Sequence, residues 1–165
     1  MEEADLRREL ERCHRPAYSW ALHCCRWDPA DAEDVLQTAY LKVLDGRARF
    51  DGRSSFRTWL FAVIRRTALD VRRRTVLRWR RSAPLDDALA AARDDPSEEN
   101  ANLVGALRRL SDRQRDVLLL VFYHERTVEE AAAVLGIRVG SARTHYARGK
   151  ERLRAMLEEE MDDDG

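Results

Sequence analysis

The sequence has few residues that break helices: its 165 residues include only 7 glycines and 4 prolines. Long helices can therefore form with few interruptions, and nothing in the composition indicates a β-rich protein. Hydrophobic residues make up 44% of the chain, enough for a core, and charged residues make up 36%. At this length we expect one mid-sized domain or two small helical ones.

Cysteine is also scarce. Cys13, Cys24 and Cys25 are odd in number and include no C-x-x-C pair, which argues against a disulfide framework and against a zinc site. No apolar run approaches the roughly 18 residues of a membrane span. The charged N-terminal residues do not resemble a signal peptide. We therefore expect a cytoplasmic protein with no membrane span, no metal and no cofactor.

Catalytic groups in a usable arrangement are missing as well. The four histidines, His14, His23, His124 and His145, stand in no Ser or Cys triad context. The many carboxylates show no metal-like or acid–base spacing, and no glycine-rich loop could hold a phosphate. These absences predict that the chain is not an enzyme.

Charge is balanced in total but unevenly distributed. The chain has 30 basic and 30 acidic residues and a net charge of zero. Basic residues gather over 65–81 and 138–154, and acidic residues over 86–99 and 158–164. The neutral total therefore combines two positive surfaces with two negative segments.

Three helices are expected in the first half of the chain, over 6–27, 31–44 and 55–74, from apolar residues at helical spacing. Pro16 is expected to kink or restart the first helix. Asp31 is the expected N-cap of the second. In the third helix, Trp59 and Leu69 are assigned to the core, and arginines supply the outer surface.

The stretch 82–102 differs from its neighbours, because acidic residues and proline predict a flexible linker, with a transient helix over 88–92. Beyond it, Ser111 is a predicted N-cap, and residues 117–122 are the expected apolar core of the next helix. The acidic tail over 158–165 is expected to fray. As a hypothesis, this tail competes with DNA for a basic surface; a solvated tail is the alternative.

Residues 127–150 have the pattern of a helix-turn-helix. Thr127 and Glu130 predict a capping box, Gly136 permits the turn, and a basic helix follows from 140 or 141 to about 156. Side chains suited to base edges and phosphates follow on this helix: Ser141, Arg143, Thr144, His145, Arg148 and Lys150. We interpret the second helix as one that enters the major groove. A surface helix with a solvated basic face is the alternative.

Two further segments have a functional and a structural interpretation. Over 50–81, a loop with glycine precedes aromatic residues and a run of arginines, which suits unpaired bases and phosphates. The same aromatic residues could simply form core, and the arginines a solvated surface. The helix over 31–44 is either an ordinary amphipathic helix or one whose polar side docks a protein partner.

These segments together resemble the extracytoplasmic-function sigma factors. Residues 31–37, 49–50, 55–60 and 68–70 are similar to region 2 of that family, and residues 110–115, 127–136 and 140–154 are similar to its region 4. The resemblance implies an all-α fold with two small helical domains, a three- to four-helix bundle and a helix-turn-helix domain. The implied boundaries are 1–81 for region 2, 82–102 for the linker, 103–158 for region 4 and 159–165 for the acidic tail.

The resemblance also implies partners: core RNA polymerase, promoter DNA and, as in many members, an anti-sigma factor. It implies that polymerase binds Asp31, Asp34, Gln37 and Leu41, and that region 4 also touches the polymerase flap. Residues over 141–150 would contact the −35 element. The implied contacts to the −10 element are Phe50, Arg53, Ser54, Phe56, Arg65, Arg66 and Arg73. Arg66 stands where the family often has Asn, near the base-reading pocket, so the −10 preference does not follow from the resemblance.

Two other classes of protein share part of this pattern. A response-regulator-like DNA-binding protein has the helix-turn-helix but no polymerase-binding first domain. A protein-interaction module, such as a sigma decoy, binds polymerase without directing initiation. Binding to core polymerase separates the first class from a sigma factor, and run-off transcription separates the second.

Overall fold

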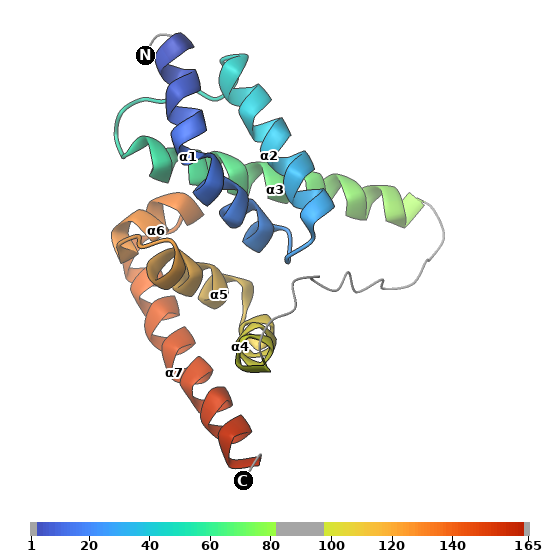
Figure 1. Ribbon diagram of the computed structural model, residues 1–165, viewed down its shortest axis with the longest axis vertical. Helices are drawn as coiled ribbons and strands as arrows, with labels where there is room; N and C mark the ends of the chain where they lie inside the picture. The colour runs from blue at the N-terminus through green and yellow to red at the C-terminus, as the bar shows by residue number, and fades with distance from the viewer. Residues whose placement is uncertain (1–2, 82–97, 164–165) are drawn as a thin grey trace. The chain divides into compact units, whose positions relative to one another are not determined.

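The computed structural model describes residues 3–81 and 98–163, and helices make up most of both stretches (Figure 1). No strand occurs within these residues, in agreement with the predicted all-α fold. The chain divides into two compact units, with the boundary between residues 92 and 93. We call them unit 1 and unit 2 and describe each by itself.

Unit 1 consists of three helices, α1 (Glu3–Cys24), α2 (Pro29–Leu44) and α3 (Phe56–Arg81). Each helix contacts the other two, and α1 and α2 lie side by side across α3 (Figure 1). At the centre, the indole N–H of Trp20 donates a hydrogen bond to the Phe61 carbonyl oxygen at 3.0 Å. The two rings stack with centroids 5.7 Å apart, and both side chains are fully buried. This pair joins α1 to α3.

Proline residues affect both of the first two helices of unit 1. α1 passes through Pro16 without restarting. Because proline has no N–H, the Arg12 carbonyl oxygen lacks its helical hydrogen-bond donor. Arg12 is exposed, so water can donate to this oxygen instead. The N-cap of α2 is Asp28, not Asp31: the Asp28 carboxylate accepts a hydrogen bond from the Asp31 backbone N–H at 3.0 Å. Pro29 suits the first helical position because its φ is already helical and it has no N–H to satisfy.

The third helix continues beyond the predicted end at residue 74, to Arg81. Its second half extends past α1 and α2 (Figure 1), so apolar residues there lack cover from those helices. Leu69 is 39% exposed, and Val76 and Leu77 are also exposed. The assignment of Leu69 to the core was therefore wrong.

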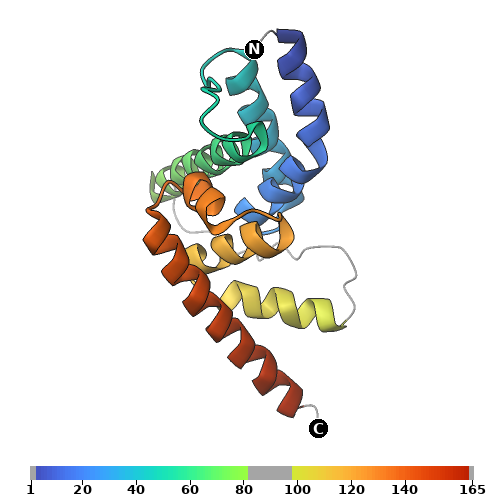
Figure 2. The ribbon, with the colours of Figure 1, turned by 90° about the vertical axis from the view of Figure 1, so that its left-hand side faces the viewer.

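Unit 2 contains α4 (Glu98–Arg109), α5 (Asp112–Leu118), the π-helical turn η1 (Leu119–Tyr123), α6 (Val128–Leu135) and α7 (Val139–Asp163). The long α7 contacts α4, α5 and α6, and Figure 2 shows it running along the unit. It is the element around which the others assemble.

The α5 segment begins as predicted and ends differently. The Ser111 hydroxyl oxygen accepts a hydrogen bond from the Gln114 backbone N–H at 3.4 Å, which confirms the N-cap. Val117 and Leu120 are fully buried, but Phe122 is 62% exposed although the pattern placed it in the core. The π turn is the physical reason: its wider i to i+5 hydrogen bonding changes the helical phase and turns Phe122 outward.

Two acidic segments form more helix than predicted. α4 begins at Glu98, inside the predicted linker, where negative charge suits a helix N-terminus. Residues 82–97, which include the predicted transient helix over 88–92, lie outside the described residues. α7 continues to Asp163 instead of ending near 156. A helix rises about 1.5 Å per residue, so the helical part of the tail extends away from the start of α7. This geometry does not support competition between the helical part of the tail and DNA for the predicted contacts at the start of α7.

Candidate nucleic-acid interface

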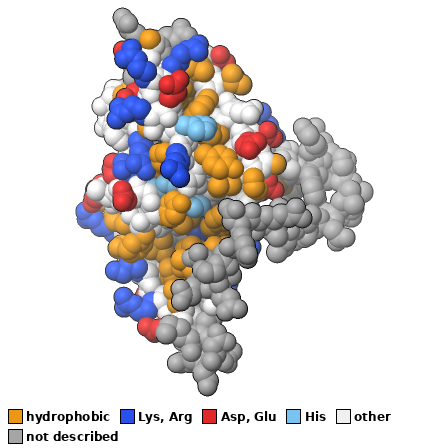
Figure 3. All heavy atoms as spheres, in the orientation of Figure 1, with side chains coloured by type: hydrophobic (Ala, Val, Ile, Leu, Met, Phe, Trp, Pro, Cys, Tyr) orange, Lys and Arg blue, Asp and Glu red, His pale blue; other side chains and the backbone are white. Residues whose placement is uncertain are grey.

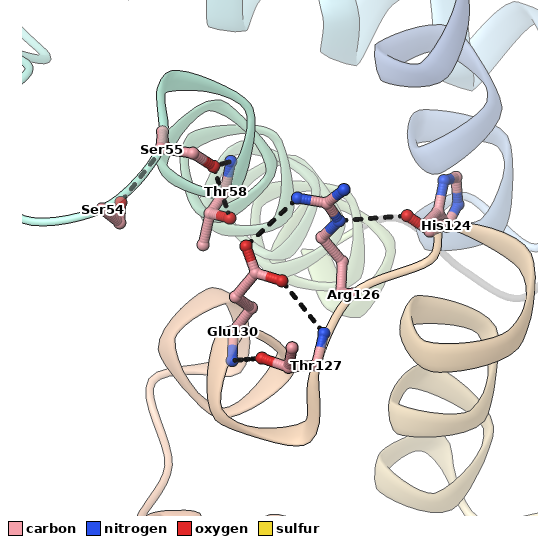
Figure 4. Close-up of polar contacts among 7 residues, drawn as sticks. All are labelled: Ser54, Ser55, Thr58, His124, Arg126, Thr127 and Glu130. Carbon is pink, nitrogen blue, oxygen red and sulfur yellow. Dashed lines mark hydrogen bonds and ion pairs between the residues drawn. The ribbon is translucent and has the colours of Figure 1, made fainter.

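The first helix of the predicted helix-turn-helix is held at its start by the capping box. The Thr127 hydroxyl oxygen accepts from the Glu130 N–H at 3.1 Å, and a Glu130 carboxylate oxygen accepts from the Thr127 N–H at 3.0 Å (Figure 4). Arg126 extends the network, since it pairs with Glu130 at 3.1 Å and donates to the His124 carbonyl at 3.0 Å. The predicted capping box is confirmed, and it sets where α6 begins.

The turn between α6 and α7 depends on small residues. Gly136 has a φ of 63° and ψ of 37°, a left-handed conformation that ends α6. Ala131 and Ala142, one on each helix, are fully buried, so the two backbones can cross closely. Arg113 donates to the Leu135 carbonyl at 3.2 Å and so satisfies the end of α6. The two crossed helices form the predicted helix-turn-helix.

A second close approach, between α5 and α7, was not predicted. A Cβ added to Gly149 would lie 3.2 Å from the Gln114 Cβ and 3.2 Å from a Leu118 methyl carbon. Both distances are shorter than comfortable contacts, so α7 packs against α5 because residue 149 has no side chain. The sequence offered one hint of this contact: Gly149 lies inside the predicted helix, where no turn requires a glycine.

The predicted −35 contacts do not all lie together on α7. Ser141, Thr144 and Arg148 follow an i, i+3, i+7 spacing, which places them on one exposed stripe. The Thr144 hydroxyl donates to the Gly140 carbonyl at 3.1 Å, and His145, beside the stripe, is half-buried. We call Ser141, Thr144 and Arg148 the α7 stripe.

The two other predicted contacts on α7 lie at the edge of its exposed surface. Arg143 forms an ion pair with Glu129 of α6 at 2.8 Å. The Lys150 ammonium lies 5.3 Å from the centroid of the Tyr146 ring, which in turn stacks on Phe122 at 5.8 Å. In the space-filling view, basic side chains lie along α7 beside a band of hydrophobic ones (Figure 3). Arg143 therefore lies toward α6, and Lys150 toward an apolar surface.

That apolar surface is a groove of about 730 Å³ between α4, η1 and α7. Its lining includes Leu103, Leu107, Leu119, Phe122, Tyr123, Leu153 and Leu157. Phe122 and Tyr123 are each more than 60% exposed. Exposed aromatic residues in a groove are typical of a protein-docking surface. Sequence reasoning missed the groove, because periodicity placed Phe122 in the core.

In unit 1, the loop before α3 ends in an aromatic cluster. The ring centroids of Phe50, Phe56 and Trp59 are 5.3–5.5 Å apart. Phe56 is buried, whereas Phe50 and Trp59 are half-buried. Trp59 was assigned to the core, and the structure places it at the core's edge instead.

Short polar contacts shape this loop. The Ser55 hydroxyl donates to the Thr58 hydroxyl oxygen at 2.9 Å and accepts from the Thr58 N–H at 3.2 Å, which starts α3 (Figure 4). The predicted −10 contact Ser54 donates to the Ser55 carbonyl at 3.2 Å. Arg53, another predicted contact, pairs with Asp51 at 3.4 Å and is almost fully exposed.

The arginines of α3 separate into buried and exposed groups. Trp59, Arg66 and Arg73 are seven residues apart and share one side of the helix; we call them the α3 stripe. Arg66 and Arg73 are exposed, but Arg65 is only 8% exposed and lies on another side. The structure therefore brings together two of the three predicted arginines that lie on α3, and it adds Trp59, which the i, i+7 spacing could have identified.

The outer side of α2 carries the predicted polymerase contacts. Asp34, Gln37 and Leu41 share one stripe with Leu44, at i, i+3, i+7 and i+10, and all four are exposed. Leu44 is 39% exposed and extends what we call the α2 stripe. Asp31 lies beside it. Partial burial, and then the charges of Asp28 and Asp34, raise the pKa of Asp31.

Neither a metal site nor a membrane-spanning helix occurs among the described residues. Over 3–81 and 98–163, no three His, Cys, Asp or Glu side chains gather in a way that could hold a metal ion. Within the same part of the chain, no helix is both long and apolar enough to cross a membrane.

Comparison with known proteins identifies the family. The Sigma-70 region 2 model matches residues 10–80, and the Sigma-70, region 4 model matches residues 101–153. The chain is 31% identical to the ECF RNA polymerase sigma factor SigX of Bacillus subtilis, over 92% of this chain and 84% of that protein. It is 33% identical to the RNA polymerase sigma-E factor of Streptomyces avermitilis, over 79% and 73% of the two chains.

Solved structures show the same fold. The sigma factor RpoE, in complex with the anti-sigma factor NepR from Bartonella quintana, gives a TM-score of 0.77 at 22% identity, over 93% of this chain and 97% of that one. CnrH, in complex with the cytosolic domain of CnrY, gives 0.67 at 25% identity, over 95% and 90% of the chains. With both sigma regions matched in order, the chain belongs to the extracytoplasmic-function family of RNA polymerase sigma factors.

Proposed function

We propose that this protein binds core RNA polymerase and divides promoter recognition between its units, with unit 2 on the −35 element and unit 1 on the −10 element. The observation that carries the proposal is the helix-turn-helix of unit 2, whose second helix presents the exposed α7 stripe. A chain with this helix-turn-helix and no polymerase-binding unit would be a simple DNA-binding protein. The match of residues 10–80 to Sigma-70 region 2 distinguishes this protein from that class.

In unit 2, the start of α7 is suited to the major groove of duplex DNA. The N-terminal part of a recognition helix contacts base edges, and flanking donors bind phosphates. Ser141 and Arg148 would make such contacts from the stripe, and Arg143 from its edge. The turn at Gly136 and the close packing at Gly149 support this role, because the angle of α7 decides which side chains reach the bases.

In unit 1, the α3 stripe and the aromatic cluster are suited to unpaired bases. Aromatic faces stack on bases of any identity, and arginines bind the backbone phosphates. Phe50 and Trp59 are the accessible aromatic residues, with Arg66 and Arg73 on the same side of α3 as Trp59. Strand separation at the −10 element would exchange base stacking for these contacts.

Two protein-docking surfaces remain for polymerase. The α2 stripe begins with the polar Asp34 and Gln37 and ends with the apolar Leu41 and Leu44, a combination suited to a helical partner such as the polymerase clamp. The apolar groove of unit 2 would receive the polymerase flap. An anti-sigma factor for this protein would act by covering one of these two surfaces.

Core binding and transcription test the proposal directly. Leu41→Asp should abolish co-elution with core polymerase, because it places a charge on the apolar end of the α2 stripe. Leu77→Asp is the matched control, since Leu77 is 58% exposed and Leu41 is 54% exposed. On a promoter library, the wild-type protein with core polymerase should give run-off transcripts from defined start sites.

Two outcomes would contradict the proposal. DNA binding without core binding would indicate a simple DNA-binding protein. Core binding without initiation from any promoter in the library would indicate a decoy.

A further inference from the structure

The contact between Glu129 and Arg143 links the two helices of the helix-turn-helix. A Glu129 carboxylate oxygen lies 2.8 Å from a terminal guanidinium nitrogen of Arg143. Glu129 is the second residue of α6, and Arg143 lies near the start of α7, 14 positions later. The pair therefore lies at the end of α7 that faces DNA in the proposed function.

This ion pair contributes little to holding the fold. Both side chains are exposed, Glu129 at 56% and Arg143 at 67%, and exposed ion pairs are weak because water screens them. The capping box at Thr127 and the turn at Gly136 already set the positions of α6 and α7. A function in orienting the arginine side chain accounts better for the contact.

An arginine that is held in one rotamer is a more selective base contact than a free one. A free side chain loses rotamer entropy on binding and can shift to meet an incorrect base. The guanidinium has five N–H donors in a rigid plane, so one bond to Glu129 favours one orientation of that plane and leaves donors for a base. The hydrogen bond from Arg143 also lowers the pKa of Glu129, as expected for a carboxylate that accepts from a cation.

We propose that Glu129 is a specificity-determining residue that positions Arg143 against one base pair of the −35 element. This inference rests on the proposed function, because it assigns a task within −35 recognition. Glu129 also places a negative charge near the DNA backbone, which opposes binding to every sequence equally. Its removal should therefore raise general DNA affinity while it lowers discrimination at one base pair.

The simplest rival role for Glu129 is a mask that withholds Arg143 from DNA. A mask predicts that removal strengthens the arginine's contact and leaves discrimination unchanged or higher. Positioning predicts the opposite change in discrimination, so affinity and selectivity must be measured separately.

The experiment measures binding of the holoenzyme to promoters that differ at each base pair of the −35 element. Arg143→Ala first identifies the base pair that this side chain recognises. Glu129→Ala should reduce discrimination at that same base pair by about three- to tenfold, part of what one bidentate arginine contact provides. Glu129→Asp keeps the charge but is one methylene too short, so it should lose discrimination without a gain in general affinity.

Two controls isolate the effect. Glu151→Ala removes an exposed carboxylate from α7 and should change all sequences alike. In an Arg143→Ala background, Glu129→Ala should have no further effect on discrimination, since the two residues act through one contact. Unchanged thermal unfolding of the variants shows that the exposed substitutions leave the fold intact.

Full discrimination in both Glu129→Ala and Glu129→Asp would overturn the inference, and so would an effect at a base pair other than that of Arg143. If the wild-type holoenzyme shows no preference at any −35 position, the proposed function of unit 2 fails instead.

Discussion

Units 1 and 2 both present arginines from a long helix, but they hold that helix by different means. In unit 1, α3 is held by large side chains, with Trp20 stacked on Phe61 at its centre. In unit 2, α7 is held through close approach at two small residues, Ala142 and Gly149. Bulky packing buries much apolar area and suits a platform for unpaired bases. Close backbone approach sets a helix angle, which matters for a helix that must enter a groove.

The largest expected effect tests the aromatic core of unit 1. Trp20→Ala should destabilise unit 1 by about 3–5 kcal/mol, as for other large aromatic truncations in a core. It removes the stacked ring and leaves the Phe61 carbonyl without its indole donor. Amide hydrogen exchange across the full chain should show lost protection in unit 1 and retained protection in unit 2.

Trp20→Phe is the matched control, and it should cost less because it keeps an aromatic ring. Equal loss of protection in both units would show that they fold as one, and the comparison between them would fail.

The next effect tests recognition by α7. Arg143→Ala should weaken binding to the −35 duplex by about 1–3 kcal/mol if the arginine makes a bidentate base contact. Lys150→Ala, a substitution on the same helix, should leave −35 preference unchanged because Lys150 lies over Tyr146 beside the apolar groove. Binding of the holoenzyme to promoter variants measures both. A larger loss from Lys150→Ala would reverse the roles assigned to these two residues.

A smaller effect tests the close approach between α5 and α7. Gly105→Ala, where an added Cβ meets no atom within 4 Å, should stabilise unit 2 by about 0.5–1 kcal/mol because alanine favours helix. Gly149→Ala has the same helical advantage, but its Cβ would press on Gln114 and Leu118. We expect it to destabilise unit 2 in urea unfolding. Equal stabilisation by both substitutions would show that glycine is not required at position 149.

The smallest effect concerns Asp31, at the start of α2. Its pKa is raised, chiefly by burial and then by Asp28 and Asp34, so ionised Asp31 opposes folding at neutral pH. This destabilisation decreases as the pH falls through the folded-state pKa of Asp31, and it is absent below the unfolded-state pKa of about 4. Asp31→Asn should therefore melt slightly higher than wild type at pH 7, and the difference should vanish in acid. The Asp28 cap is unaffected, because it uses the Asp31 backbone N–H.

Much of the fold could be predicted because helix boundaries depend on neighbouring residues. Ser111, Thr127 with Glu130, and Gly136 act on backbone groups within four positions, and the structure confirms each. The errors have equally local causes. Pro29 moved the N-cap of α2 to Asp28, and a π turn moved Phe122 out of the core.

The candidate site was less predictable, because exposure depends on residues far along the chain. Arg65 and Arg66 are adjacent and chemically identical, yet one is buried and the other exposed. Leu69 was assigned to the core but is 39% exposed, as is the apolar Leu44, since no other described helix of unit 1 covers them. Trp59 joined the α3 stripe for the same reason.

The sequence by itself determined the helices, their caps and the helix-turn-helix, since backbone hydrogen bonding and helical periodicity act over a few residues. Its two motif blocks also determined the family. Only the tertiary structure decided which side chains meet: Glu129 with Arg143, Gly149 against α5, and the leucines and aromatic residues around the groove of unit 2. These contacts join residues from different helices, and the packing of the helices determines which side of each one faces its neighbours.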